Sequence, residues 1–170
     1  MYKNKTFLAI VPARGGSKRL PRKNILDLNG KPLVAWSIEA GLNSRYIDKV
    51  IVTSDDNEIL KISKKYGAST IKRPYELAND TATTIDTVRH AIESMDKTYD
   101  YVVLLQPTSP LRTCTHIDEA IELLDKKNAN AIISVCEMEH NPLWSNTLPK
   151  DRSLAGFLKD RFFIIKNHNE

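Results

Sequence analysis

Five basic side chains stand close together near the start of the chain, in the stretch VPARGGSKRLPRKN (residues 11–24). They are Arg14, Lys18, Arg19, Arg22 and Lys23, and two adjacent glycines, Gly15 and Gly16, lie among them. Arginine can donate two parallel hydrogen bonds to phosphate oxygens, and lysine supplies a compact point charge. Glycine lets the backbone turn and bring its N–H groups close to an anion. The combination predicts a binding site for a polyphosphate.

Two common nucleotide-binding loops are excluded, because neither GxxxxGK[ST] nor GxGxxG occurs in the chain. Composition alone leaves open a solvated basic loop or a nucleic-acid patch, since short basic runs often bind nucleic acid. However, no aromatic residue lies between residues 14 and 24 to stack on bases. Outside the cluster, the other 20 of the 25 basic residues face 21 acidic ones, so no extended basic face is implied. We therefore expect no nucleic-acid partner.

The elements that must hold this loop alternate between strand and helix patterns. Strand patterns occur at residues 7–13, 49–54, 69–74, 101–106 and 131–136. Helical patterns occur at 32–42, at 56–67, from Thr83 or Thr84 to about 95, and at 115–127, where Thr115 to Asp118 resembles a capping box. This alternation predicts an α/β fold of the Rossmann-like, three-layer α/β/α kind, with a mostly parallel sheet.

Two of the strand patterns carry further expectations. YVVLLQ (101–106) is the most continuous apolar run of the chain, which predicts a central strand that is buried on both faces. AIISVC (131–136) is the last clear strand pattern and ends at Cys136, for which we expect a reduced cysteine in the core.

Length and composition predict a single domain over residues 1–170. No apolar run approaches the ~18 residues of a membrane span. The first ten residues lack the basic region, long apolar region and cleavage site of a signal peptide. These features predict a cytoplasmic protein without a membrane partner. The two cysteines and four histidines show no metal-site spacing.

The position of the basic loop in such a fold favours a ligand site. Ligands of open α/β sheets bind beyond the carboxyl ends of the strands, and this loop leaves the first strand at that end. Gln106 ends the 101–106 strand, where a buried amide needs partners, so a role in the site is favoured. Arg73 beside Pro74 could also be a surface loop residue, and Thr84 could be only a helix cap.

Four ordered segments of the chain resemble the acylneuraminate cytidylyltransferases, the enzymes that make CMP-activated sialic acids. They are ARGGSK with PRKN (13–24), VTSD (52–55), RPYELANDTATT (73–84) and LQPTSPLR (105–112), within a match from residue 7 to about 145. The loop Asn141–Trp144 favours a legionaminic-acid type within that family. The resemblance implies a nucleotidyltransferase fold.

The resemblance also implies a reaction. The anomeric hydroxyl of a nine-carbon 2-keto sugar acid (sialic, legionaminic or pseudaminic acid) attacks the α-phosphate of CTP, and pyrophosphate leaves, usually with Mg²⁺. Arg14 and Lys23 are implied to hold the triphosphate and to offset charge on the leaving group, which makes them the catalytic candidates. The other implied substrate-binding residues are Asn24, Arg73, Ala82, Thr84 and Gln106. The backbone around Ala82 is expected to read the cytosine edge.

Members of the family usually continue for several dozen residues beyond the end of this sequence. They carry a late pair of aspartates that holds the metal and a short arm that forms a homodimer. The resemblance therefore implies that this chain lacks the family's usual C-terminal part, with Arg161 as the candidate for a late catalytic arginine. Asp55, Asp56 and Asp80 are the nearby carboxylates that could replace the metal ligands. A non-catalytic CTP-binding remnant is the alternative to an enzyme.

Overall fold

The computed structural model of the protein describes residues 1–17, 19–79, 82–137, 139 and 150. The chain divides into two units, Met1–Ile132 and Ile133–Glu170, and every helix and strand that is described belongs to the first. The prediction of one domain over residues 1–170 stays a prediction. No helix in the described ranges combines the length and apolarity needed to cross a membrane.

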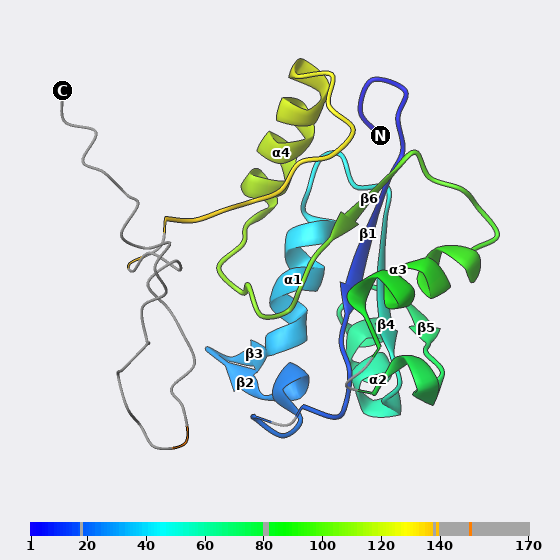
Figure 1. Cartoon of the computed structure of the whole chain (residues 1–170), viewed down its shortest axis with the longest axis vertical. Coiled ribbons are helices and arrows are strands. Elements are labelled where there is room, and N and C mark those ends of the chain that lie inside the picture. Colours follow the sequence, from blue (N-terminus) through cyan, green and yellow to red (C-terminus); the bar gives the residue numbers. More distant parts are fainter. Residues whose placement is uncertain (18, 80–81, 138, 140–149, 151–170) are drawn as a thin grey trace. The chain divides into compact units, whose positions relative to one another are not determined.

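The first unit is built on a sheet of four parallel strands in the order β5-β4-β1-β6 (Figure 1). Its strands are β1 (Phe7–Pro12), β4 (Lys49–Ser54), β5 (Ser69–Lys72) and β6 (Tyr101–Leu104). A small antiparallel hairpin pairs β2 (Asp27–Leu28) with β3 (Lys31–Pro32), and two 3-10 turns, η1 (Lys23–Ile25) and η2 (Tyr75–Leu77), lie in the loops. β1 lies in the middle because its apolar side chains are buried on both faces of the sheet.

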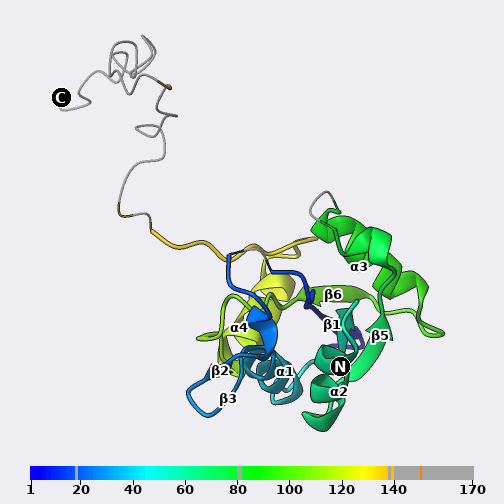
Figure 2. The same cartoon turned by 90° about the horizontal axis from the view of Figure 1, so that it is seen from below.

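Helices cover both faces of this sheet (Figure 2). α1 (Leu33–Leu42), α2 (Asn57–Lys65) and α4 (Cys114–Lys126) pack on one face, and α3 (Thr84–Glu93) packs on the other. Successive side chains of a strand point to opposite faces. Ala9 and Val11 accordingly join the core with α1, α2 and α4, whereas Leu8 and Ile10 join the core with α3. The three-layer α/β/α prediction is confirmed.

The prediction that residues 101–106 form a central strand is wrong for the described part of the chain. β6 pairs only with β1 and therefore lies at the edge of the described sheet. Its side chains Val102 and Leu104 are 39% and 40% exposed. A continuous apolar run indicates a strand, but its place in the sheet depends on which other segments pair with it.

The predicted strand at residues 131–136 is also not observed. These residues have no strand structure, and Ile133 and Val135 are 83% and 90% exposed. Cys136, expected in the core, is exposed. A strand needs a hydrogen-bonding neighbour, and no described segment pairs with these residues, so the apolar pattern alone does not produce a strand.

α4 begins two residues earlier than the sequence pattern suggests, and this changes the role of Asp118. Thr113 caps the helix and forms a capping box with His116. Asp118 is buried instead and accepts hydrogen bonds from Ser44 Oγ at 2.6 Å and from Arg45 Nε at 2.9 Å. The carboxylate therefore fastens α4 to the loop that follows α1.

Replacing Asp118 with Asn should lower the free energy of unfolding by about 2–3 kcal/mol, because hydrogen bonds to a charged group contribute about 1.5–3 kcal/mol each. Burial raises the pKa of Asp118, but the bonds from Ser44 and Arg45 outweigh it and hold the pKa below 3.8. The contribution is therefore present above that pH and disappears as the pH falls through the lowered pKa. Urea denaturation at neutral pH and at pH 3 checks both statements. The exposed Glu119→Gln is the control and should change stability by less than about 0.5 kcal/mol.

Candidate functional site

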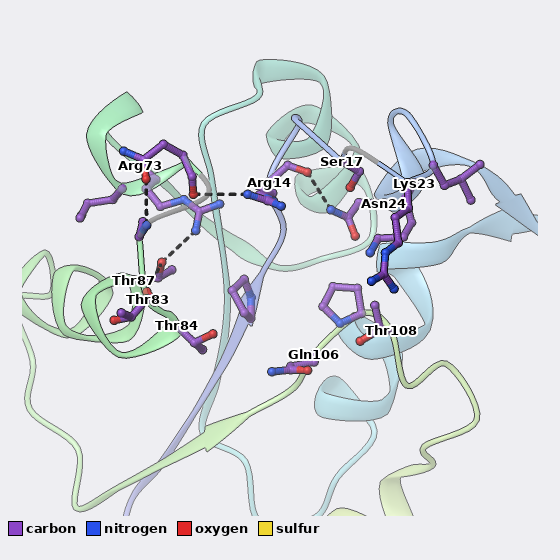
Figure 3. Close-up of a pocket in the computed structure, with 17 residues that line it drawn as sticks. Arg14, Ser17, Lys23, Asn24, Arg73, Thr83, Thr84, Thr87, Gln106 and Thr108 are labelled. Atoms are coloured by element: carbon purple, nitrogen blue, oxygen red, sulfur yellow. Dashed lines mark hydrogen bonds between the residues drawn. The ribbon is translucent and has the colours of Figure 1, made fainter. Parts of the chain in front are cut away.

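A cavity of about 600 Å³ opens at the carboxyl ends of the strands (Figure 3). This volume is within the usual range for ligand sites. It is lined by all seven residues predicted for the site: Arg14, Lys23, Asn24, Arg73, Ala82, Thr84 and Gln106. The structure thus brings these residues together from three segments, which follow β1, β5 and β6, although their individual roles stay predictions.

The cavity is strongly positive. Four of its lining residues are cations, namely Arg14, Arg19, Lys23 and Arg73, and none of the described lining residues is acidic. In Figure 3, Arg14 lies between Arg73 and Lys23, and Gln106 faces them across the open space. A cavity with this distribution of charge attracts an anionic ligand.

The basic residues that crowd together in the sequence take different directions in the structure. Arg22 does not line the cavity, because its guanidinium pairs with Asp56 at 3.2 Å and with Glu58 at 2.6 Å. Arg19 does line it, although nothing in the sequence distinguishes Arg19 from the neighbouring cations. Only the backbone path decides which cations of such a cluster face the ligand.

Arg73 is the most informative of the four cations. Its side chain is only 5% exposed, and its Nη1 donates a hydrogen bond to Thr87 Oγ1 at 3.0 Å. Its Nε and Nη2 are buried and have no hydrogen-bond partner among the described residues. Burial lowers the pKa of Arg73, and Asp55 acts in the opposite direction, but guanidinium does not lose its proton in proteins. Unsatisfied buried donors cost free energy, so these two groups of Arg73 indicate that a ligand supplies the acceptor.

Hydrogen bonds of Asn24 and Gly15 hold the loop after β1 in place. Asn24, which is 4% exposed, donates from Nδ2 to the Arg14 carbonyl at 2.8 Å and so closes the loop. The expectation that the glycine N–H groups face the anion is wrong for Gly15, because its N–H is bonded to Asp55 Oδ1 at 3.0 Å. Gly15 is instead required for space: a Cβ there would lie 2.8 Å from Asp56 Oδ2.

Asn79 organises the segment that precedes α3, and sequence reasoning did not single it out. Its side-chain oxygen accepts the Ala82 N–H at 2.8 Å, and its backbone carbonyl accepts a bond from Arg14 Nη1 at 3.3 Å. The Ala82 N–H is therefore engaged by Asn79. That the backbone around Ala82 reads the cytosine edge stays a prediction. The preference of Asn for turns was the signal that could have identified it.

Two neighbouring threonines at the start of α3 have different structural roles. Thr83 is the N-cap, and its hydroxyl accepts the Asp86 N–H in a capping box. Thr84 is the first residue of the helix and lines the cavity. The capping role that the sequence left open between the two belongs to Thr83.

Gln106 is held in place through its backbone. Its carbonyl accepts hydrogen bonds from Ser109 N at 3.2 Å, Ser37 Oγ at 3.3 Å and Arg112 Nη2 at 3.0 Å. Arg112 also donates to Ser37 Oγ at 3.3 Å, so one guanidinium spans both groups. This arrangement leaves the Gln106 side chain directed at the cavity (Figure 3).

Replacing Arg112 with Lys should lower the free energy of unfolding by about 1–2 kcal/mol. The ammonium keeps the charge but lacks the planar fork that reaches both Gln106 and Ser37. Chemical denaturation measures the change. Arg89→Lys on the exposed side of α3 is the matched control, and an equal loss in both variants would contradict the bridging role of Arg112.

The carboxylates proposed as metal ligands are used for other purposes where they are described. Asp55 holds Gly15 and pairs with Arg73, and Asp56 caps α2 through the N–H groups of Glu58 and Ile59. Among the described residues no three acidic, histidine or cysteine side chains gather as a metal would require. The described residues therefore form no metal site from side chains alone, and Mg²⁺, which usually needs only one or two carboxylates beside substrate phosphates, stays a prediction. The candidates Asp80, Arg161 and Asn141–Trp144 lie outside the described residues.

Comparison with known proteins identifies relatives of one kind. A family model described as cytidylyltransferase matches residues 8–150. A pseudaminic acid cytidylyltransferase of Campylobacter jejuni is 42% identical over 137 residues, which cover 78% of this chain and 59% of that protein. A CMP-N,N'-diacetyllegionaminic acid synthase of Legionella pneumophila is 39% identical over 88% of this chain and 66% of its own length. An N-acylneuraminate cytidylyltransferase of Escherichia coli is 49% identical over 69% of this chain and 28% of its length.

Solved structures agree on the fold. A CMP:2-keto-3-deoxy-manno-octonic acid synthetase complexed with CTP has a TM-score of 0.63 at 24% identity, over 73% of this chain and 49% of that one. A cytidylyltransferase of Leptospira borgpetersenii has a TM-score of 0.59 at 25% identity, over 71% of this chain and 49% of that one. The match of the family model over most of the sequence, together with these relatives, shows that the chain belongs to the cytidylyltransferase family.

Proposed function

We propose that this protein transfers CMP from CTP to the anomeric hydroxyl of a nine-carbon 2-keto sugar acid and releases pyrophosphate. The observation that carries the proposal is the cavity, which four cations and no described acidic residue line. One of these cations, Arg73, has two buried N–H groups without a hydrogen-bond partner among the described residues. The curated relatives named above carry the names of enzymes for pseudaminic, legionaminic and acylneuraminic acids, which supports the substrate class.

In this reaction the sugar hydroxyl oxygen forms a bond to the α-phosphorus, and the bond from that phosphorus to the bridging oxygen of pyrophosphate breaks. The hydroxyl proton passes to solvent. Arg14, Lys23 and Arg73 would bind the triphosphate and stabilise the charge that gathers on the leaving pyrophosphate. Gln106, across the cavity, would orient the sugar acid against the α-phosphate.

Mg²⁺, a homodimer and a cytoplasmic location complete the proposal. The first two rest on the family resemblance, and the location rests on the sequence features that predicted it. No step above runs through a metal ion. A second candidate function is a protein that binds CTP without turning it over, and it is favoured by the engagement of Asp55 and Asp56, two of the candidate metal ligands, in other bonds.

One experiment separates the two functions. The chain is incubated with CTP and each of the three sugar acids, with and without Mg²⁺, and CMP-sugar is measured by chromatography. CTP binding is measured in parallel by calorimetry. Formation of CMP-sugar supports the enzyme, binding without product supports the second function, and absence of both overturns the proposal. The other three nucleoside triphosphates serve as controls for the base.

A further inference from the structure

Three parallel strands end side by side at the cavity, and one carboxylate lies between their ends. β4 and β5 are in register at Ser54 and Lys72, so the next residues, Asp55 and Arg73, face each other beyond the sheet. The register is extended by a bond from the Arg73 N–H to the Ser54 carbonyl at 2.8 Å. Gly15 reaches the same place from β1, whose end is tied to β4 by the bond from Ala13 N–H to the Thr53 carbonyl.

A single oxygen of Asp55 contacts both neighbours. Oδ1 accepts the Gly15 N–H at 3.0 Å, and the same oxygen lies 3.7 Å from Arg73 Nη2. The latter distance is that of an ion pair without a hydrogen bond, which is why Nη2 remains unsatisfied. Asp55 is therefore the counter-ion of the buried Arg73 and, at the same time, an anchor for the loop that carries Arg14.

The position of Asp55 is itself fixed. The ammonium of Lys72 donates to the Asp55 backbone carbonyl and to Asn57 Oδ1, so the end of β5 holds the turn between β4 and α2. Arg73 is held from its other side by Thr87. Thr87 and Asp55 thus hold the guanidinium of Arg73, which also lines the cavity, from two sides.

We propose that Asp55 is a positioning residue for nucleotide binding, which couples the anion-binding loop at Gly15 to the buried guanidinium of Arg73. The inference rests on the proposed function, because the ligand it concerns is CTP. It predicts a change in CTP affinity opposite to the one expected from charge alone. By Coulomb's law alone, removal of a negative charge beside a triphosphate site strengthens binding. If Asp55 holds Gly15 and Arg73 in place, its removal weakens binding.

The test compares Asp55→Asn with Glu58→Gln, which removes a nearby negative charge that contacts neither Gly15 nor Arg73 and whose partner is Arg22. CTP and inorganic tripolyphosphate are titrated into each variant by calorimetry. We expect CTP affinity to fall about tenfold in D55N and to change less than about twofold in E58Q. An affinity in D55N that equals or exceeds that of the unaltered chain would overturn the proposal.

A double-mutant cycle with Arg73→Met distinguishes coupling from a merely structural loss. The amide oxygen of Asn can still accept the Gly15 N–H, so D55N mainly removes the charge that faces Arg73. If Asp55 acts through Arg73, D55N should therefore cost little further CTP affinity once Arg73 is replaced. Losses that simply add in D55N/R73M would contradict the coupling. The cycle has a second readout in thermal unfolding. D55N leaves a buried charge uncompensated, so the double variant should melt at a higher temperature than D55N.

The melting comparison needs no ligand, so it separates failure of this inference from failure of the proposed function. If the unaltered chain binds neither CTP nor tripolyphosphate, the proposed function fails, and the melting temperatures still decide whether Asp55 compensates Arg73. A double variant that melts below D55N would overturn the inference on its own.

Discussion

Replacing Arg73 with Met should weaken CTP binding by about 10²–10³-fold, the largest effect we expect from a single substitution in the cavity. Each hydrogen bond from a charged donor contributes about 1.5–3 kcal/mol, and Arg73, which lines the cavity, has two donors without a hydrogen-bond partner among the described residues. Methionine fills a similar volume, so the loss reports on the guanidinium rather than on a cavity left behind. Calorimetric titration of CTP measures it.

Two further variants serve as a control for this measurement and as a test of charge against geometry. Arg89→Met removes an arginine of α3 that is 63% exposed and pairs with Asp86, and CTP affinity should remain within about twofold. Arg73→Lys keeps the charge but cannot offer two parallel donors, so most of the affinity should still be lost. If R73K bound CTP as well as the unaltered chain, charge alone would explain Arg73 and the fork would be irrelevant.

Replacing Gly15 with Ala should destabilise the protein by about 1–3 kcal/mol and weaken CTP binding together with it. The new Cβ would lie 2.8 Å from Oδ2 and 3.0 Å from Cβ of Asp56. Asp56 cannot retreat easily, because its Oδ1 caps α2 and its Oδ2 pairs with Arg22. The loop must therefore shift, and Arg14 shifts with it. Denaturation and CTP titration measure the two losses.

The neighbouring glycine provides a matched control for Gly15. A Cβ at Gly16 would have no described atom within 4 Å apart from those of the adjacent residues. Neither Gly15 nor Gly16 has a positive φ. Gly16→Ala should therefore change stability by less than about 0.5 kcal/mol. Equal losses in the two variants would show that backbone freedom, rather than the close approach to Asp56, explains the pair.

The local parts of the fold were predictable because their signals are local. The apolar runs at 7–13 and 49–54 became β1 and β4, and the helical pattern at 56–67 became α2. Alternation of strands and helices was sufficient for the three-layer architecture, and the seven residues suggested by the family resemblance line one cavity. Each of these predictions depends on the chemistry of a short segment or on the order of segments.

Features that depend on partners distant in the sequence could be decided only by the tertiary structure. The apolar run at 101–106 says nothing about which segments will pair with it, and in the described sheet β6 lies at the edge. Likewise, Asp118 looked like a capping residue, but Ser44 and Arg45, more than seventy residues away, bury it. Burial and pairing are properties of the packed chain, so a local pattern cannot specify them.

The same distinction holds within the site. The sequence by itself determined that a cluster of cations follows the first strand, and it therefore predicted an anion-binding site near the end of that strand. It could not determine that Arg22 turns toward Glu58, or that Arg73 is buried with two N–H donors unsatisfied. The burial of Arg73 was decided when the ends of β1, β4 and β5 came together around Asp55, because there a backbone N–H and a buried guanidinium meet one carboxylate oxygen.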